Sequence, residues 1–159
     1  MRLTMAETGR SWAAVQVDVE VPIEAPVLKV WQLMTQQVEK WWPISFCANR
    51  ERAKSFHWEM KLAGRMYEDW GNGDGWLWWT IYKLDSQNHL ICAQGNMGNG
   101  VLLTDVTFTL HKRGSQTLLR IKEIVTGAID DAAALEAGQI KGWNELFRDA
   151  FKPYAENSA

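Results

Sequence analysis

Hydrophobic and polar residues alternate along much of this chain, and the alternation predicts a series of strands. From Val15 to Val21, valine occupies every second position, and Gln16, Asp18 and Glu20 lie between the valines. Successive side chains of a strand point to opposite faces, so this segment predicts a half-buried strand. Comparable runs, separated by turn residues such as Gly, Asn and Asp, predict further strands at residues 56–62, 65–70, 76–84, 89–94, 101–111 and 117–126.

Two other segments have the apolar spacing of helices. Residues 27–38, which follow Pro26, predict a short helix, and Pro43 marks its end. Residues 130–156 predict one long amphipathic helix, with Asp130 or Asp131 as its N-cap. At 100° per residue, one stripe of this helix carries Ala133, Glu136, Ile140, Trp143, Phe147, Phe151 and Tyr154.

The order of elements is a strand, a short helix, about six strands and a long helix, which predicts an α+β domain. A helix this apolar on one side must bury that side, and the sheet is the only large element that can receive it. A curved antiparallel sheet wrapped around one long helix often leaves a cavity between them. The pattern therefore predicts a binding site for a small apolar ligand at this interface.

Length and cysteine content indicate a single intracellular domain. The chain has 159 residues, which predicts one domain over residues 12–157, with residues 1–11 as a flexible leader that lacks the apolar core of a signal peptide. Cys47 and Cys92 are far apart and belong to no metal-ligand cluster, so we expect no metal site and a cytoplasmic location. A loop rich in Gly and Asn is expected at residues 95–100.

Charge and hydropathy exclude two classes of partner. The 17 basic and 19 acidic residues give a net charge of −2, so no electrostatic footprint for nucleic acid is present. No apolar run is long enough to span a bilayer, so we expect no membrane insertion. The ten tryptophans change the picture, because they predict either a bulky aromatic core, a ligand pocket or an adhesive sheet surface.

Four segments carry a resemblance to a known family. They are residues 19–26 (VEVPIEAP) leading to Val30-Trp31, residues 56–70 (FHWEMKLAGRMYEDW), the Trp-rich segment 75–90, and Gly142-Trp143 in the last helix. In these segments the chain resembles the SRPBCC superfamily, which is also called START-like or Bet v 1-like. Within it, the chain is most similar to the bacterial proteins grouped with the Hsp90-ATPase-activator homology domain.

The resemblance implies the helix-grip fold, in which a curved sheet grips a long C-terminal helix and encloses a deep, largely apolar cavity. Relatives include lipid carriers, polyketide cyclases, hormone-binding proteins and co-chaperone domains, so the fold does not decide the function. No catalytic motif of the cyclases and no cofactor site can be transferred residue by residue.

Apolar residues on the predicted inner faces are candidates for the cavity wall. The inner faces of the strands and the helix stripe supply Trp58, Met60, Trp78, Phe108, Ile140, Trp143 and Phe147. Gly142 weakens the helix by roughly 1 kcal/mol relative to alanine, and close approach of the sheet backbone would account for it. Such an approach would press the indole of Trp143 against the sheet.

Three carboxylates are candidates for polar chemistry. Glu123 falls on an apolar strand face, where Arg65, Glu68 or Arg120 could pair with it. Glu136 falls on the buried stripe of the last helix, so it either looks into the cavity or reaches solvent from the helix start. Glu59 shares a strand face with His57, but the opposite apolar face makes a solvated surface the simpler interpretation.

The function that this pattern favours is a carrier or sensor that binds a small hydrophobic or aromatic ligand, without catalysis. An enzyme of cyclase or hydrolase type is the first alternative, and it needs one of the three carboxylates buried. A protein-interaction domain, either co-chaperone-like or self-associating, is the second. The segment 76–82 is apolar on both strand faces, so an exposed face there would favour a homodimer.

Overall fold

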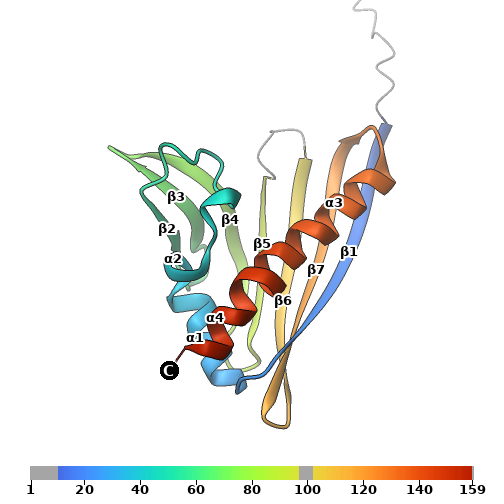
Figure 1. Cartoon of the computed structure of the whole chain (residues 1–159). Helices are drawn as coiled ribbons and strands as arrows, with labels where there is room; N and C mark the ends of the chain where they lie inside the picture. Colours follow the sequence, from blue (N-terminus) through green and yellow to red (C-terminus); the bar gives the residue numbers. More distant parts are fainter. Residues whose placement is uncertain (1–10, 97–101, 159) are drawn as a thin grey trace, which may run out of the picture.

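The protein was analysed as a computed structural model, which describes residues 11–96 and 102–158. Within these residues, seven strands form one antiparallel sheet in the order β1-β7-β6-β5-β4-β3-β2 (Figure 1). The strands are β1 (Ser11–Ile23), β2 (Ser55–Trp58), β3 (Arg65–Gly71), β4 (Asp74–Asp85), β5 (Leu90–Asn96), β6 (Leu102–Arg113) and β7 (Gln116–Ile129). The predicted leader and most of the predicted loop 95–100 lie outside the described residues.

The helices form two groups at the sheet. Between β1 and β2 lie α1 (Val27–Gln36), α2 (Val38–Trp41) and the short 3₁₀ helix η1 (Ile44–Phe46). The last segment is one long helix in three parts: α3 (Ala132–Asn144), the π-helical η2 (Glu145–Phe151) and α4 (Lys152–Asn157). Figure 1 shows this long helix crossing one face of the curved sheet, from the end of β7 to α1. The predicted helix-grip arrangement is confirmed.

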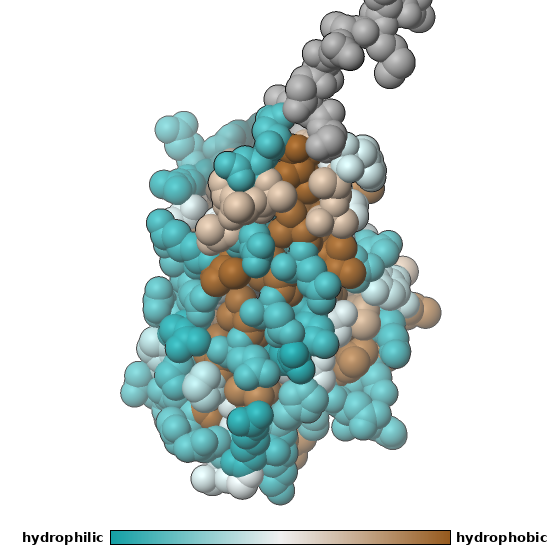
Figure 2. All heavy atoms as spheres, turned by 90° about the vertical axis from the view of Figure 1, so that its right-hand side faces the viewer, coloured by the Kyte–Doolittle hydropathy of each residue, from teal (hydrophilic) through white to brown (hydrophobic). Residues whose placement is uncertain are grey.

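The alternation in β1 places its valines in the core. Val15, Val17, Val19 and Val21 are buried, and the strand pairs along its whole length with β7. Asp131 caps α3 by accepting a hydrogen bond from the backbone N–H of Ala134 at 3.0 Å, as the sequence predicts. On the side of the molecule that carries the β1 edge, hydrophobic residues form a broken band between hydrophilic ones (Figure 2).

An aromatic cluster fills the space between the sheet and the long helix. The ring of Phe108 in β6 lies 5.6 Å from Trp143 and 5.7 Å from Phe147, measured between centroids. Trp41 joins the cluster from α2 through Phe147 and Phe151, at 5.3 Å and 4.8 Å. Because these rings occupy most of the interior, the deep cavity implied by the family resemblance is reduced to a small one.

One predicted strand and the predicted buried stripe of the long helix are longer than those in the structure. The strand expected at residues 56–62 ends at Trp58, and Leu62 is 69 % exposed. The chain turns there, because Ala63 has a φ of 59° and a Cβ on Gly64 would meet the backbone oxygen of Glu59 at 1.9 Å. In the long helix, Ala133 is exposed, so the buried stripe begins later than predicted.

Candidate functional site

The long helix and the inner face of the sheet enclose a small apolar cavity of about 80 Å³. Strand β4 and the long helix supply most of its wall. The remainder comes from Trp42, just after α2, and from Phe46 on the segment 43–54, which we call the strap. The wall consists of Trp42, Phe46, Trp78, Trp79, Gln139, Gly142, Trp143 and Leu146.

Glu123 of β7 is fully buried behind one wall of this cavity. Its carboxylate accepts hydrogen bonds from the Thr104 hydroxyl and from the indole N–H of Trp143, each at 2.6 Å. The side-chain amide of Gln139 donates at 3.3 Å. Trp143 and Gln139 both line the cavity, so one layer of side chains separates the carboxylate from the cavity space.

The strand register explains why the expected partners of Glu123 are wrong. Glu123 lies opposite Val17 of β1 and Val106 of β6, so neither Arg65 nor Glu68 is its cross-strand neighbour. Arg120 pairs instead with Asp18, at 2.5 Å on the outer face. Glu123 therefore has hydrogen-bond donors around it in place of a cation.

The surroundings of Glu123 favour its protonated form. Burial raises the pKa of this carboxyl above its ordinary value, and the hydrogen bonds from Thr104, Trp143 and Gln139 oppose the shift without cancelling it. No charged neighbour among the described residues contributes to the shift. A buried carboxyl with a raised pKa beside an apolar cavity is a candidate for proton transfer.

We expect the stability cost of Glu123→Gln to shrink as the pH rises from about 4 to about 8. A raised pKa means that folded Glu123 holds its proton more tightly than the unfolded chain does. Its contribution to stability is therefore fully present below the unfolded pKa, about 4.3, and is lost as the pH rises through the folded pKa. Glutamine does not titrate. Urea unfolding of both proteins across this pH range measures the effect, and an equal cost at every pH would contradict it.

Glu68 of β3 is a second fully buried carboxylate, and the sequence analysis did not propose it as a site residue. Its carboxylate accepts hydrogen bonds from the indole N–H groups of Trp70 and Trp78, at 3.1 Å and 2.9 Å. It also accepts hydrogen bonds from the backbone N–H groups of Ala48 and Asn49 in the strap. Since Trp78 lines the cavity, both of these tryptophan walls, Trp78 and Trp143, are backed by buried carboxylates.

A signal for Glu68 was present in the sequence. In β3 it has the same parity as Met66, which is buried, so it points to the inner face. What the sequence could not show is that the strap returns to this strand and offers its backbone amides there. The contributions of Trp42 and Phe46 were missed for the same reason, because the chain between α2 and β2 has no periodic pattern. Trp79 lies in β4 and was missed because a register shift at Trp78 changes which side chains of this strand face inward.

The structure brings some of the predicted cavity residues together and separates others. Trp78 and Trp143 line the cavity and Glu123 lies behind it. Three of the others, Trp58, Phe108 and Phe147, are buried in the aromatic core, and Ile140 is partly buried against that core. Met60 lies on a separate surface hollow formed by α1, α2, β2 and β3.

Glu136 and Glu59 are not cavity residues. Glu136 is exposed on α3, so its predicted place on the buried stripe is wrong. The first turns of this helix extend past the cavity. Glu59 forms an ion pair with Arg65 at 2.9 Å, and the hydrogen bonds from Arg65 lower the pKa of Glu59 to about 2. His57 contacts the hydroxyl of Ser55 and the ring of Tyr67, away from the cavity.

Gly142 faces the strap, whereas the sequence analysis expected it to face the sheet. A Cβ at this position would lie 3.8 Å from the Phe46 ring, which is ordinary contact, so no close backbone approach explains the glycine. Gly142 instead keeps the cavity open at its helical wall. Trp143 does lie against the sheet, with its ring 5.9 Å from that of Trp79 and nearly parallel to it.

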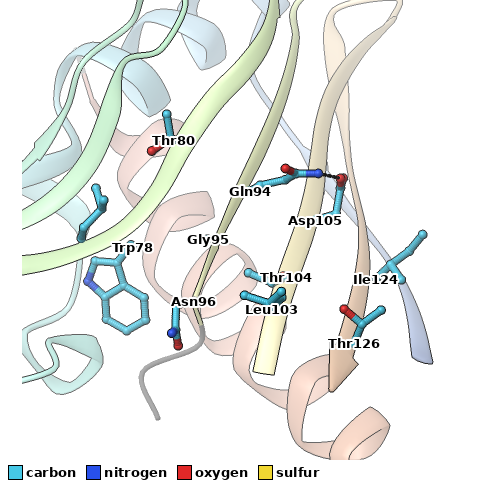
Figure 3. A pocket seen from close by; sticks show the side chains of 11 residues that line it. Trp78, Thr80, Gln94, Gly95, Asn96, Leu103, Thr104, Asp105, Ile124 and Thr126 are labelled. Carbon is cyan, nitrogen blue, oxygen red and sulfur yellow. Dashed lines mark hydrogen bonds between the residues drawn. The ribbon is translucent and has the colours of Figure 1, made fainter. Parts of the chain in front are cut away.

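A larger hollow of about 660 Å³ lies on the sheet beside β4, β5, β6 and β7 (Figure 3). It exposes Leu77, Leu103 and Ile124, and its polar floor contains Gln94, which donates to Asp105 at 2.7 Å. The smaller cavity is the better candidate site, because its wall is almost entirely apolar and buried carboxylates lie behind two of its tryptophans.

Other site classes find no support among the described residues. In residues 11–96 and 102–158, no group of three or more His, Cys, Asp or Glu side chains is placed to hold a metal ion. Within the same ranges, no helix combines the length and apolar character needed to cross a membrane.

Comparison with known families decides the family of the chain. Residues 24–156 match the family described as "Activator of Hsp90 ATPase homolog 1-like protein". The chain belongs to this family. The resemblance found in the sequence is thus confirmed, and the match begins directly after β1 and extends through most of α4. No curated protein sequence matches the chain.

Solved structures share the fold at low sequence identity. Norcoclaurine synthase from Thalictrum flavum, in complex with dopamine and hydroxybenzaldehyde, is 11 % identical with a TM-score of 0.65, covering 100 % of this chain and 98 % of its own. CalU16 from Micromonospora echinospora is 15 % identical with a TM-score of 0.61, covering 94 % and 86 %. Ara h 8.0201 is 10 % identical with a TM-score of 0.68, covering 92 % and 100 %. These likenesses establish the fold alone.

Proposed function

We propose that this protein is a single-domain carrier or sensor that binds a small hydrophobic or aromatic ligand in the cavity between the sheet and the long helix. The observation that carries the proposal is the composition of the cavity wall, in which Trp42, Trp78, Trp79 and Trp143 meet at one space. Sites for small ligands are enclosed, mostly apolar and provided with a few converging polar groups. Gln139 adds a polar side chain to the wall, and Glu68 and Glu123 hold the rings of Trp78 and Trp143 from behind.

Ligand entry requires a movement of the Phe46 side chain. The cavity volume of about 80 Å³ is smaller than the roughly 150 Å³ of a cavity known to hold benzene. Phe46 is only partly buried and closes the cavity next to Gly142. Rotation of this ring toward solvent would enlarge the cavity without disturbing the sheet. The hydrogen bonds that the backbone amides of Ala48 and Asn49 donate to Glu68 keep the strap in place while the ring moves.

We expect Gly142→Leu to abolish ligand binding without unfolding the protein. Leucine is a good helix former, and its side chain would fill the space between Phe46 and Trp143. Titration of tryptophan fluorescence with 1-naphthol should show saturable binding to the parent. The affinity of Gly142→Leu should be at least roughly tenfold lower, which corresponds to an overpacking cost of about 1.4 kcal/mol or more.

Gly138→Leu is the matched control, because Gly138 lies one helical turn earlier and a Cβ there meets nothing within 4 Å. This variant should bind like the parent, and both variants should keep the parent's circular dichroism spectrum. If Gly142→Leu binds as tightly as Gly138→Leu, the ligand does not occupy this cavity. If the parent binds no aromatic, fatty acid or polyketide-like compound, the carrier proposal fails.

An enzyme of cyclase or hydrolase type is the alternative, and Glu123 is the feature that favours it. Its buried carboxyl, with a raised pKa, lies one side chain away from the cavity and has the properties of a general acid. A thiol nucleophile is disfavoured, because burial, followed by the nearby Glu68 carboxylate, raises the pKa of Cys47 to about 11. Turnover of a bound ligand that Glu123→Gln abolishes, with binding retained, would favour the enzyme.

Location, partners and association remain proposals. Cys47 and Cys92 are both free thiols, which supports a reducing cytoplasmic location. Leu77, Leu103 and Ile124 are exposed on the outer face of the sheet, so a homodimer through this face stays a prediction, which light scattering would test. A co-chaperone role rests only on the family description, and no contact surface within residues 11–96 and 102–158 supports it specifically.

A further inference from the structure

The buried carboxylates behind the cavity are already engaged by donors of the protein. Glu123 accepts hydrogen bonds from Thr104 and Trp143, and the amide of Gln139 donates to it as well. Glu68 accepts from the indoles of Trp70 and Trp78 and from strap amides. A ligand in the cavity therefore meets indole rings whose N–H groups point away from it, toward the carboxylates.

Two other tryptophans of the wall have indole N–H groups that are not engaged by the protein. Trp42 is 9 % exposed and Trp79 is 4 % exposed, and the indole N–H of each is buried without a hydrogen-bond partner. Both rings line the cavity. A buried donor without an acceptor carries the full cost of its desolvation, so a ligand that supplies an acceptor gains more here than at a solvated donor.

The rings around the cavity also restrict the shape of the ligand. Trp79 and Trp143 are nearly parallel, with an interplanar angle of 19° and ring centroids 5.9 Å apart. Trp42 meets Trp79 edge to face at 77°, with centroids 6.4 Å apart. Flat rings pack well against such surfaces, in offset or edge-to-face contact. A purely aliphatic ligand would fill the same space and leave both N–H groups unpaired.

We propose that the cavity selects a flat aromatic molecule that carries a neutral oxygen acceptor, such as an aryl ketone, and that the indole N–H groups of Trp42 and Trp79 recognise this oxygen. The proposal rests on the proposed carrier function and names the chemical class of its ligand. The two indoles act as specificity determinants, and the rings of Trp78 and Trp143, held by Glu68 and Glu123, supply the stacking surface.

An organic cation is the strongest competing ligand. Indole faces attract cations, and the carboxylates behind Trp78 and Trp143 would favour positive charge. The positive ends of the unpaired N–H dipoles of Trp42 and Trp79 oppose it. Donors of the protein already engage both carboxylates, which weakens their attraction for a cation. The balance favours a neutral acceptor.

A matched set of small probes tests the proposal: indane, 1-indanone and phenyltrimethylammonium. Indane and 1-indanone have the same bicyclic skeleton and differ by one carbonyl. Calorimetric titration of the parent protein should give roughly 3- to 10-fold tighter binding of 1-indanone, the size of one net neutral hydrogen bond. Desolvation alone would favour indane, so the order of the two affinities is diagnostic.

Substitution of the indoles by phenylalanine assigns the effect to the N–H groups. In Trp79→Phe and Trp42→Phe the preference for 1-indanone over indane should disappear, while indane still binds. Trp41→Phe is the matched control, because the Trp41 N–H is equally buried and unpartnered, yet its ring lines none of the cavities described above. The control should keep the preference of the parent.

A measurement on the parent protein tests the proposal even if the variants fail to fold. In ¹H–¹⁵N spectra of the ¹⁵N-labelled protein, 1-indanone should move the indole N–H signals of Trp42 and Trp79 downfield, whereas indane should not. Equal or tighter binding of indane, or tightest binding of phenyltrimethylammonium, would overturn the acceptor proposal and leave the carrier function standing. Binding of none of the three probes would overturn both.

Discussion

Glu68→Leu is expected to lower the free energy of unfolding by roughly 4 kcal/mol, because it leaves several buried donors without an acceptor. The indoles of Trp70 and Trp78 and the strap amides of Ala48 and Asn49 all point at this carboxylate. Each unpaired buried donor costs about 1–3 kcal/mol, and partial exposure of the strap relieves some of that cost. Urea unfolding monitored by circular dichroism measures the effect.

Glu68→Gln separates the loss of acceptors from the loss of shape. The glutamine amide keeps one oxygen acceptor and replaces the other oxygen by an NH₂ group, which faces donors and cannot accept from them. We therefore expect a smaller but clear loss of about 2 kcal/mol. Glu59→Gln is the control in the turn just before β3, where the carboxylate is at the surface and pairs with Arg65, so little change is expected. A Glu68→Leu protein as stable as Glu59→Gln would show that the strap is not held by Glu68.

The predicted sheet follows from residue periodicity. Alternation in Val15–Val21 and in the later runs identifies the strands, because burial of one face requires it. The same reasoning extended the second strand to Leu62, where a positive φ at Ala63 turns the chain. Alternation over a few residues therefore predicts which side is buried better than it predicts where a strand ends.

The π-helical segment shifts the buried line at the C-terminal end of the long helix. An ideal α-helix places Tyr154 in line with Trp143 and Phe147, as the sequence analysis assumed. The wider turns of η2 keep residues four apart on one face, so the buried line continues from Phe151 to Ala155, and Tyr154 is only partly buried. A π-helix has no reliable signal in the sequence, so this shift by one residue could not be predicted.

Half of the site depends on contacts that no local pattern encodes. Trp78, Glu123 and Trp143 were found because each lies in a periodic element. Trp42 and Phe46 belong to the irregular chain before β2, and their place in the cavity depends on how the strap returns to β3. The register shift at Trp78, where Met66 pairs with Trp79 and Tyr67 pairs with Leu77, also decides which tryptophan faces inward, and a β-bulge of this kind is a tertiary feature.

Trp143→Ala is expected to destabilise the protein by about 3–5 kcal/mol, the usual cost of truncating a large buried aromatic side chain. The Trp143 ring is buried and packs against Trp79, Phe108 and Phe147, at centroid distances of 5.9, 5.6 and 5.9 Å. The same change removes a donor from the buried Glu123 carboxylate. Trp12→Ala is the control, because Trp12 is 75 % exposed and its truncation should cost little.

Trp143→Phe isolates the hydrogen bond from the packing. Phenylalanine keeps an aromatic ring in place but cannot donate to Glu123, so we expect a loss of about 1–2 kcal/mol. The indole N–H lowers the pKa of Glu123, and its removal should raise that pKa further. The cost of Trp143→Phe should therefore grow as the pH rises from about 4 to about 8, where the ionised form of Glu123 loses its donor. In the Glu123→Gln background this pH dependence should vanish. A cost that is independent of pH in both backgrounds would mean that Trp143 acts by packing alone and that its bond to Glu123 has no energetic role.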